Sequence, residues 1–389
     1  MRILQIETFG RGGLIHYAYN LSCALAERGH EVTLMTAAAY ELDGRDLPAN
    51  VRLVKAIGRI TQRTGGGIPA FATRLARRIE AVVDAGTVAA FARRLRPDVI
   101  HLHCTNPISL LYLMLLRLLG VPLVATAHVV TPHERPLFQH AIYRRIHRIS
   151  HLIIAHSDFD RKRLLEEFAI DPERVVVIPH GEYGFFASGG DVQDRDTARR
   201  SLGLEPPDEV ALFFGYIREY KGLDVLLEAW PKVMDARPGA RLLVAGDPVR
   251  LDPARRKELE AWATSLRVVH HFDYIPFSDV TRYFRAADAI VMPYRHISQS
   301  GVLFLALSLG VPVVAARVGA LPELLRDDDS ALLVPPESPA DLAKALIRLL
   351  GDSELQERLA ESGRRIADQH SWPSIAERTE SAFLRLVED

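Results

Sequence analysis

A series of short apolar runs, each followed by a polar or glycine-containing loop, constrains the fold of this chain more than any other feature. The runs occupy residues 2–7, 32–36, 98–103, 123–127, 152–155 and 175–178 in the first half, and 210–214, 241–245, 268–272, 289–292 and 312–316 in the second. Apolar runs of this length are typical of parallel strands that are buried on both faces. Helical periodicity separates several of them, at residues 15–28, 222–235, 252–266, 278–286 and 300–309. The pattern therefore predicts an α/β chain with parallel sheets.

The length of 389 residues exceeds what one hydrophobic core usually supports, so we expect two domains. The segment Gly189–Arg200 is polar and acidic, which suits a boundary. We therefore divide the chain into residues 1–188 and 189–370, each a doubly wound α/β domain. Ligands of such sheets bind at the carboxyl ends of the strands, so a cleft between two facing domains is the expected site.

The run from Ala289 to Leu324 reads as strand, polar loop, helix and strand. Ser300 suits an N-cap, and Gly310 suits the end of that helix. A helix that begins beyond a parallel strand directs free N–H groups and a positive dipole end into the crevice, where a phosphate is readily held. An ordinary strand-helix connection explains this segment equally well.

Two further loops can contact a phosphate. The glycine loop Gly10–Gly13 lacks the third glycine of a dinucleotide fingerprint, because Ile15 stands there, and no acid follows the second strand. It can still bring backbone N–H groups close to an anion, and we favour this interpretation over the alternative of a plain turn. In the second half, Arg218 and Lys221 lie between a predicted strand and helix, where two cations can clamp a diphosphate. A solvated basic pair is the alternative.

Together these motifs resemble one family. The β-GRGG-α opening, the loop GYIREYKGLD at 215–224, the segments PYR, QSGV and GVPVVA within 293–315 and the tail GALPEL at 319–324 are similar to the retaining glycosyltransferases of family 4. The resemblance covers essentially the whole chain. It implies the GT-B fold, with two Rossmann-like domains facing each other across a cleft. It also implies that the last helix, residues 371–389, crosses back to the first domain.

The resemblance further implies an enzyme that moves a sugar from a nucleotide diphosphate to an acceptor hydroxyl with retention of configuration, in the glycosylation of a surface glycan, a glycolipid or a metabolite. The implied site residues are His128, Arg218 and Lys221 as catalytic groups, Gly12, Gly13, Arg218, Lys221, Ser300, Gly301 and Val302 around the donor diphosphate, and Tyr274, Ile275 and Glu323 around the base and ribose. No metal and no other cofactor is expected, because fixed cations and helix dipoles can neutralise the leaving group.

Two departures from the family pattern affect donor recognition. Most members carry two glutamates in the loop and helix of the last phosphate-binding unit, and Ile297 and Leu305 stand at those positions here. Tyr216 replaces the arginine that usually follows the loop glycine, with Arg218 two residues later. The chain therefore resembles a variant branch of the family. Glu323 is a candidate for some of the lost hydroxyl contacts, and a role as a simple helix cap is equally open.

Several histidines lie at or near predicted strand ends. They are His101, His103, His128, His133 and His180. A lone histidine in such a place is more often a structural group than a catalyst. His128 is the strongest functional candidate, because it matches the family's histidine beside the reacting sugar. Neither the histidines nor the two distant cysteines have the spacing of a metal site or a disulfide framework, which fits a reducing cytoplasm.

Other partners are constrained less directly. The stretch Arg59–Arg78 has five arginines and no acid, so it can contact the anionic inner face of a membrane if the acceptor is lipid-linked. A mobile acceptor loop is the alternative. Nucleic acid is not expected, because no aromatic stacking platform accompanies the charge. Two other functions stay open, a catalytically silent GT-B module that binds a nucleotide or a partner, and a nucleotide-sugar epimerase. The incomplete glycine fingerprint disfavours a dehydrogenase.

Overall fold

A computed structural model describes residues 1–58, 70–103, 109–130, 139–186, 194–248 and 251–388. The chain forms two compact units. The first comprises Met1–Gly181 and Ser371–Asp389, and the second comprises Glu182–His370. The first unit thus ends seven residues before the boundary predicted from the polar segment, whereas the return of the chain after residue 370 is as predicted.

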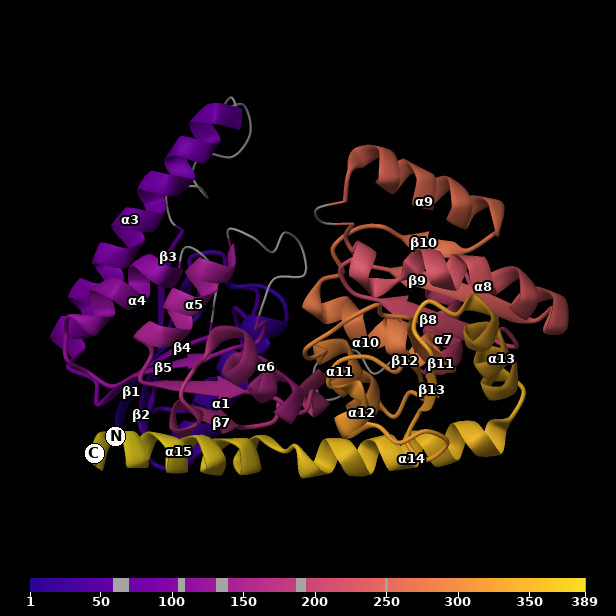
Figure 1. Cartoon of the computed structure of the whole chain (residues 1–389). Coiled ribbons are helices and arrows are strands. Elements are labelled where there is room, and N and C mark those ends of the chain that lie inside the picture. Colours follow the sequence, from indigo (N-terminus) through magenta and orange to yellow (C-terminus); the bar gives the residue numbers. More distant parts are fainter. Residues whose placement is uncertain (59–69, 104–108, 131–138, 187–193, 249–250, 389) are drawn as a thin grey trace. The chain divides into compact units, whose positions relative to one another are not determined.

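The first unit is built on a seven-stranded sheet with all neighbouring strands parallel (Figure 1). The strand order is β3 (Val51–Ile57), β2 (Glu31–Ala37), β1 (Arg2–Ile6), β4 (Val99–Leu102), β5 (Leu123–Thr126), β6 (Leu152–Ala155) and β7 (Val175–Val177). Sequence analysis predicted all of these strands except β3, which is an edge strand. The order changes direction at β1, so the glycine loop after β1 lies at the topological switch point.

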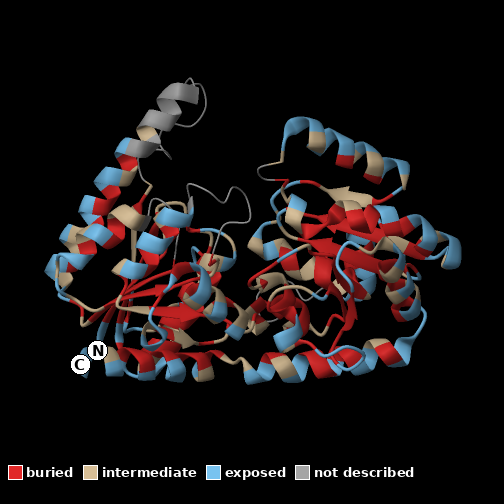
Figure 2. Ribbon diagram, in the orientation of Figure 1, coloured by how far each residue is buried: buried red, intermediate tan, exposed pale blue. Residues whose placement is uncertain are grey.

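Helices cover both faces of this sheet. They are α1 (Gly13–Glu27), α3 (Ala70–Leu95), α4 (Ser109–Arg117), α5 (Gln139–Ile149), α6 (Asp158–Phe168), the 3₁₀ turn η1 (Pro172–Arg174) and α15 (Trp372–Glu388). Successive strand residues face opposite layers. Ile3 therefore packs with α1 and α15, whereas Leu4 packs with α3 and α4. Figure 2 shows the result, a buried sheet between helices whose outer faces are exposed.

The last helix, α15, belongs to the first unit. Its Trp372 and Phe383 join the apolar cluster of Tyr17 and Leu21 on α1. At the other end of α1, Glu380 accepts a hydrogen bond from Arg28 Nε at 2.7 Å. The predicted crossing of the C-terminal helix to the first domain is therefore confirmed.

The second unit has a six-stranded parallel sheet in the order β10 (Val269–His271), β9 (Ala240–Ala245), β8 (Glu209–Phe214), β11 (Ala289–Met292), β12 (Val313–Ala316) and β13 (Leu332–Val334). Its helices are η2 (Gly184–Phe186), α7 (Arg195–Ser201), η3 (Glu219–Lys221), α8 (Leu223–Ala236), α9 (Pro253–Ser265), α10 (Phe277–Ala286), α11 (Gly301–Leu309), α12 (Leu321–Leu324), α13 (Pro339–Leu350) and α14 (Ser353–Gln369). The two units together confirm the prediction of two doubly wound, Rossmann-like domains.

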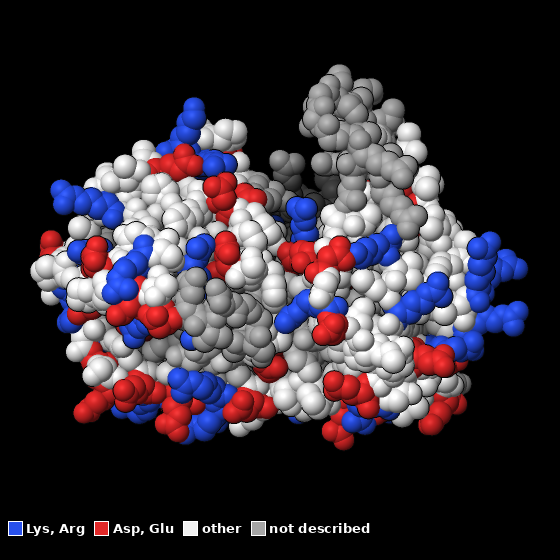
Figure 3. Space-filling view, turned by 180° about the vertical axis from the view of Figure 1, so that it is seen from behind, with Lys and Arg blue, Asp and Glu red and all other residues white. Residues whose placement is uncertain are grey.

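Among the described residues, no helix has the length and apolar character needed to cross a bilayer. The most apolar stretch, residues 108–125, divides between α4 and β5, as predicted. Acidic and basic side chains are interspersed over the face shown in Figure 3. Residues 59–69 of the basic stretch lie outside the described residues, so membrane contact there stays a prediction.

Candidate active site

The loop after β8 places two cations at the carboxyl end of the central strand of the second sheet. Gly215 and Gly222 both have positive φ, at 93° and 68°. Gly222 also lies so close to the next loop that a β-carbon there would be 2.0 Å from the Pro293 carbonyl oxygen. Only glycine fits both requirements. The turn that results directs the preceding Lys221 inward, with its Nζ 5.5 Å from the centre of the Tyr294 ring.

Lys221 is only 7% exposed. Burial, together with the nearby Arg218 guanidinium, lowers the pKa of its ammonium group to about 7. Within the described residues neither cation makes an ion pair with a carboxylate, whereas Arg295 nearby donates to both oxygens of Asp224 at 2.9 and 3.0 Å. The Arg218 Nε atom is buried without a hydrogen-bond partner among these residues. A buried cation with no anion is costly unless a ligand supplies the negative charge.

The N-terminus of α11 lies beside the same loop. The Ser300 hydroxyl caps this helix by accepting from Leu303 N at 3.3 Å. A β-carbon on Gly215 would be 3.0 Å from Lys221 Nζ and 3.2 Å from Val302 Cγ2. Lys221, Val302 and the glycine therefore meet at one point. The first backbone N–H groups of α11, at Gly301 and Val302, add the positive end of its dipole to that point.

Two aromatic side chains follow the carboxyl ends of β8 and β10, the strands on either side of β9 in this unit. Tyr216 follows β8 and Tyr274 follows β10. Their ring centres are 6.3 Å apart, and both residues are 36% exposed. Ile275 packs against the apolar core. Glu323 is exposed in the first turn of α12. The base-binding role of Tyr274 and Ile275 and the ribose-binding role of Glu323 stay predictions.

The positions of the missing glutamates are filled by core residues. Ile297 is 7% exposed and Leu305 is 5% exposed, and both belong to the apolar cluster beneath β11 and β12. Gly319 fixes the loop of Ile297, because a β-carbon there would be 1.7 Å from the Ile297 carbonyl oxygen. These positions therefore offer no carboxylate to a bound ligand.

In the first unit an acidic side chain already occupies the glycine loop. Gly12, the N-cap of α1, donates its N–H to Glu41 Oε1 at 2.6 Å, and His16 Nε2 lies 2.6 Å from the same oxygen. Gly13 begins the helix. Sequence analysis predicted that Gly12 and Gly13 contact a phosphate but missed Glu41, which is 29 residues away and carries no local signal. A phosphate at Gly12 requires this carboxylate to move.

A row of histidines follows the carboxyl ends of four adjacent strands. His103, His128, His156 and His180 come after β4, β5, β6 and β7 respectively, and all four rings surround Tyr17 of α1. Their ring centres lie 5.5, 4.8, 5.2 and 5.0 Å from that of Tyr17. Sequence analysis named all of these histidines except His156. The signal was available, because His156 ends an apolar run just as His128 does.

Three rings of this row, those of His103, His128 and His156, are held neutral. Burial lowers the pKa of His156 to about 4 and that of His101, on β4, to about 3. The pKa values of His103 and His128 fall well below the ordinary range for the same reason, and neighbouring imidazoles add to the effect. Three or more metal-ligating side chains do not converge anywhere in the described part of the chain. His133, the remaining candidate, lies outside the described residues.

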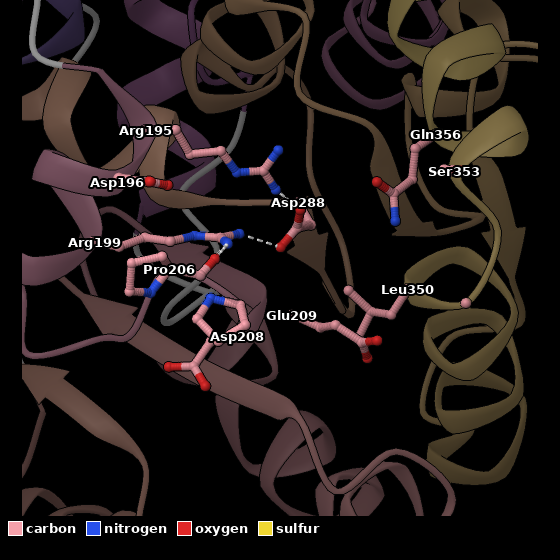
Figure 4. A pocket seen from close by; sticks show the side chains of 12 residues that line it. Arg195, Asp196, Arg199, Pro206, Asp208, Glu209, Asp288, Leu350, Ser353 and Gln356 are labelled. Atoms are coloured by element: carbon pink, nitrogen blue, oxygen red, sulfur yellow. Dashed lines mark hydrogen bonds and ion pairs between the residues drawn. The ribbon is translucent and has the colours of Figure 1, made fainter.

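The second unit also contains a cavity of about 440 Å³ at the amino end of β8 (Figure 4). Its polar wall is an internal ion cluster, in which Asp288 pairs with Arg195 and with Arg199, whose Nη2 lies 2.5 Å away. Arg199 also donates to the Ala286 and Pro206 carbonyl oxygens. Asp288 thus already pairs with both arginines. The cavity lies at the opposite edge of the sheet from Lys221, and we assign it no ligand.

Comparisons with family models, sequences and solved structures relate this chain to known proteins. Residues 11–181 match the family model described as Glycosyltransferase Family 4, and residues 208–352 match that of Glycosyl transferases group 1. The D-inositol 3-phosphate glycosyltransferase of Actinosynnema mirum is 31% identical, over 97% of this chain and 93% of that protein. The protein of the same name from Rhodococcus erythropolis is also 31% identical, over 96% of this chain and 87% of the relative.

Solved structures show the same fold. The Anabaena protein HepE in complex with UDP-glucose has a TM-score of 0.77 at 19% identity, with 99% of this chain and all of that chain covered. WaaG, a glycosyltransferase involved in lipopolysaccharide biosynthesis, has a TM-score of 0.69 at 20% identity, with 98% and 99% covered. The sequence relatives show more than a shared fold, because they match over nearly the full length of both proteins. This chain belongs to glycosyltransferase family 4 and is a glycosyltransferase with the GT-B fold.

Proposed function

We propose that this enzyme transfers a sugar from a nucleotide diphosphate donor to an acceptor hydroxyl with retention of configuration. The observation that carries the proposal is Lys221, a buried ammonium group that has no carboxylate partner among the described residues and lies at the start of α11. The ligand that best compensates it is a diphosphate. Arg218 adds a second charge, and the N–H groups of Gly301 and Val302 add neutral donors.

In this proposal the anomeric carbon–phosphate oxygen bond breaks and its electron pair stays on the diphosphate. The cation pair and the helix N-terminus stabilise that charge, so no metal ion is required. The acceptor oxygen bonds to the same face of the sugar, and its proton passes to an oxygen of the departing diphosphate. Core side chains stand at the positions of the usual glutamates, Ile297 and Leu305. We therefore favour substitution from the front face over a covalent enzyme intermediate, which needs a positioned carboxylate.

The relatives indicate which compounds to try first. HepE was solved in complex with UDP-glucose, and the curated relatives are named for D-inositol 3-phosphate. We propose UDP-sugars as the first donors and D-inositol 3-phosphate as the first acceptor. Tyr274 and Ile275 are the proposed contacts of the base and Glu323 that of the ribose.

Melting temperature is a direct test of donor binding. We expect one nucleotide among UDP, GDP, ADP and TDP, and its sugar conjugate, to stabilise the wild-type protein by about 2.7 kcal/mol at a hundred times the dissociation constant. Lys221→Ala should not respond. Lys232→Ala removes an exposed lysine from α8 and should respond as the wild type does. If no nucleotide raises the melting temperature of any variant, the proposed donor site is wrong.

A second function is a silent module that binds a nucleotide without transferring its sugar. The apolar side chains of Ile297 and Leu305 at the glutamate positions favour it. The two functions separate when the stabilising nucleotide sugar is incubated with D-inositol 3-phosphate and other polyol acceptors. Release of the nucleoside diphosphate that depends on the acceptor supports the transferase. Release of a changed sugar without acceptor would identify an epimerase instead.

Donor affinity should depend on pH through Lys221. Its pKa in the free protein is about 7, and a bound diphosphate raises it by favouring the charged form. Above pH 7, binding must therefore take up a proton, and the dissociation constant of a nucleotide sugar should rise by up to about tenfold per pH unit. Calorimetry at pH 8 in two buffers of different ionisation enthalpy measures the proton uptake. Lys221→Arg, whose guanidinium group stays protonated over this pH range, should bind without it. Binding by the wild type without proton uptake would contradict the role of Lys221.

A further inference from the structure

The imidazole rings of His128 and His156 form a hydrogen bond with each other. His156 Nδ1 lies 2.9 Å from the carbonyl oxygen of Ile178, and His156 Nε2 lies 3.1 Å from His128 Nδ1. A carbonyl oxygen can only accept a hydrogen bond, so His156 carries its proton on Nδ1. Because the ring is neutral, its Nε2 is a bare acceptor, and the proton between the two rings belongs to His128 Nδ1. The second ring nitrogen of His128, Nε2, is then also unprotonated.

From these contacts we propose that His156 is a positioning residue that fixes the tautomer of His128, so that His128 Nε2 presents a lone pair to a hydroxyl of the substrate. His128 Nε2 is buried and has no hydrogen-bond partner among the described residues. A buried acceptor without a donor is costly. A ligand that donates a hydrogen bond to it removes that cost.

The surroundings of the pair favour this arrangement. Among the described residues, the aromatic rings that contact this pair are those of Tyr17 on α1, His103 after β4 and His180 after β7. None of these neighbours is a carboxylate that would hold an imidazolium, and burial lowers the pKa values of both His128 and His156. His180 also donates from Nδ1 to a carbonyl oxygen, that of Gly181, at 2.7 Å. Backbone carbonyls thus fix the protons of two rings in the row.

The tautomer decides which ligand group His128 can bind. A bare Nε2 accepts from a hydroxyl, whereas a phosphate oxygen that bears no proton only accepts and is rejected there. Resting on the proposed function, we assign the contact to a sugar hydroxyl of the donor or acceptor and not to the diphosphate. Discrimination of this kind is strong, because an unmatched buried polar group is left unpaired.

Nitrogen-15 NMR tests the tautomer in the free protein, independently of any activity. Protein labelled at histidine should show His128 with a protonated Nδ1 and an unprotonated Nε2 between pH 6 and 8. Loss of the signal in His128→Gln identifies it. In His156→Phe, which keeps a ring but removes the acceptor, the signal should become that of a mixed or reversed tautomer. In His156→Gln, whose amide oxygen can accept, the wild-type tautomer should return.

The functional arm uses the donor found in the melting experiment. We expect His156→Phe to raise the KM for the nucleotide sugar about tenfold while the Kd for the sugar-free nucleotide stays within twofold, and His156→Gln to recover most of the loss. His147→Phe is the matched control. It alters another buried histidine, whose pKa is about 4 and whose Nε2 lies near a backbone carbonyl, but which does not touch His128.

The NMR experiment and the kinetic experiment can each contradict the proposal independently. A His128 ring protonated on Nε2 in the wild type overturns the tautomer assignment, whatever the enzyme transfers. A wild-type tautomer of His128 in His156→Phe overturns the positioning role of His156. If the tautomer does change in that variant but the KM values for the nucleotide sugar and for the acceptor both stay unchanged, the hydroxyl contact is overturned. An absence of donor binding in every variant would overturn the proposed function and leave the tautomer to be decided by NMR alone.

Discussion

Lys221→Met should raise the melting temperature of the ligand-free protein and at the same time remove donor binding. Burial of the ammonium group beside Arg218 lowers its pKa from about 10.4 in an unfolded chain to about 7. Between these values the unfolded chain binds more protons than the folded one, so stability rises with pH across that window. Below pH 7 the full cost of the buried charge is present. Methionine has a similar length and no charge.

We expect the gain in the free energy of unfolding to be on the order of 2–4 kcal/mol at pH 6, which corresponds to roughly 5–10 °C in a domain of this size. The rise of stability between pH 7 and 10 should become shallower. Affinity for the nucleotide sugar should fall by about 2–5 kcal/mol, or roughly 30-fold to several thousand-fold. Thermal melts over pH 6–10 and calorimetry measure both effects. Lys232→Met, at an exposed position of α8, should change neither.

An unchanged or lower melting temperature for Lys221→Met at pH 6 would show that the lysine is compensated within the folded protein. The electrostatic argument for a missing anion would then be lost. Retained donor affinity would place the diphosphate elsewhere. A gain in stability together with lost binding is the usual mark of a residue kept for function at the expense of the fold.

The other large effect should follow from Gly222→Ala. At φ 68° an alanine must adopt the left-handed backbone conformation, which costs about 1–2 kcal/mol. Its β-carbon would also lie 2.0 Å from the Pro293 carbonyl oxygen, a backbone atom that cannot rotate away. We expect a total loss of about 3–5 kcal/mol from the second unit. The displaced turn should move Lys221, so donor binding should weaken as well.

Gly203→Ala separates the two causes of destabilisation, the strained backbone and the clash of the β-carbon. Gly203 has a similar φ of 75°, but no atom lies within 4 Å of the place that a β-carbon would take, so only the backbone cost applies. Chemical unfolding followed by far-UV circular dichroism should give a loss of about 1 kcal/mol for this variant. Equal losses for the two variants would mean that the loop of Pro293 yields easily and does not hold the turn of Lys221 in place.

The sequence predicts the strands of this fold well where they are central and apolar. The runs that become β1, β4, β5, β8 and β11 were placed within one or two residues, since strands buried on both faces have no polar alternation to confuse them. The edge strand β3, VRLVKAI, was missed because its middle residues are exposed or half buried and include Arg52 and Lys55. The edge strand β13 is three residues long and gave too short a signal.

The candidate site was predictable where its residues are close in sequence. Arg218, Lys221 and the Ser300 helix start were found because each follows a recognisable strand. Contacts between residues that are distant in the sequence were not predictable. The Glu41 carboxylate accepts a hydrogen bond from the Gly12 N–H, 29 residues away in the sequence. His156 and His128 form a hydrogen bond across a separation of 28 residues. No local pattern encodes such a contact. Only the order of the strands brings these side chains to the same edge of the sheet.

The position of α15 has a consequence for how the chain is made. Its Trp372, Ile375 and Phe383 complete the apolar layer over α1, yet these residues leave the ribosome only after the whole of the second unit. At usual elongation rates the first unit waits roughly 10–40 s after Gly181 has been polymerised. During that interval Tyr17 and Leu21 have no cover from the missing helix. Translation therefore finishes the first unit after the second, and a nascent chain stalled within α14 should be a substrate for chaperones that bind exposed apolar helices.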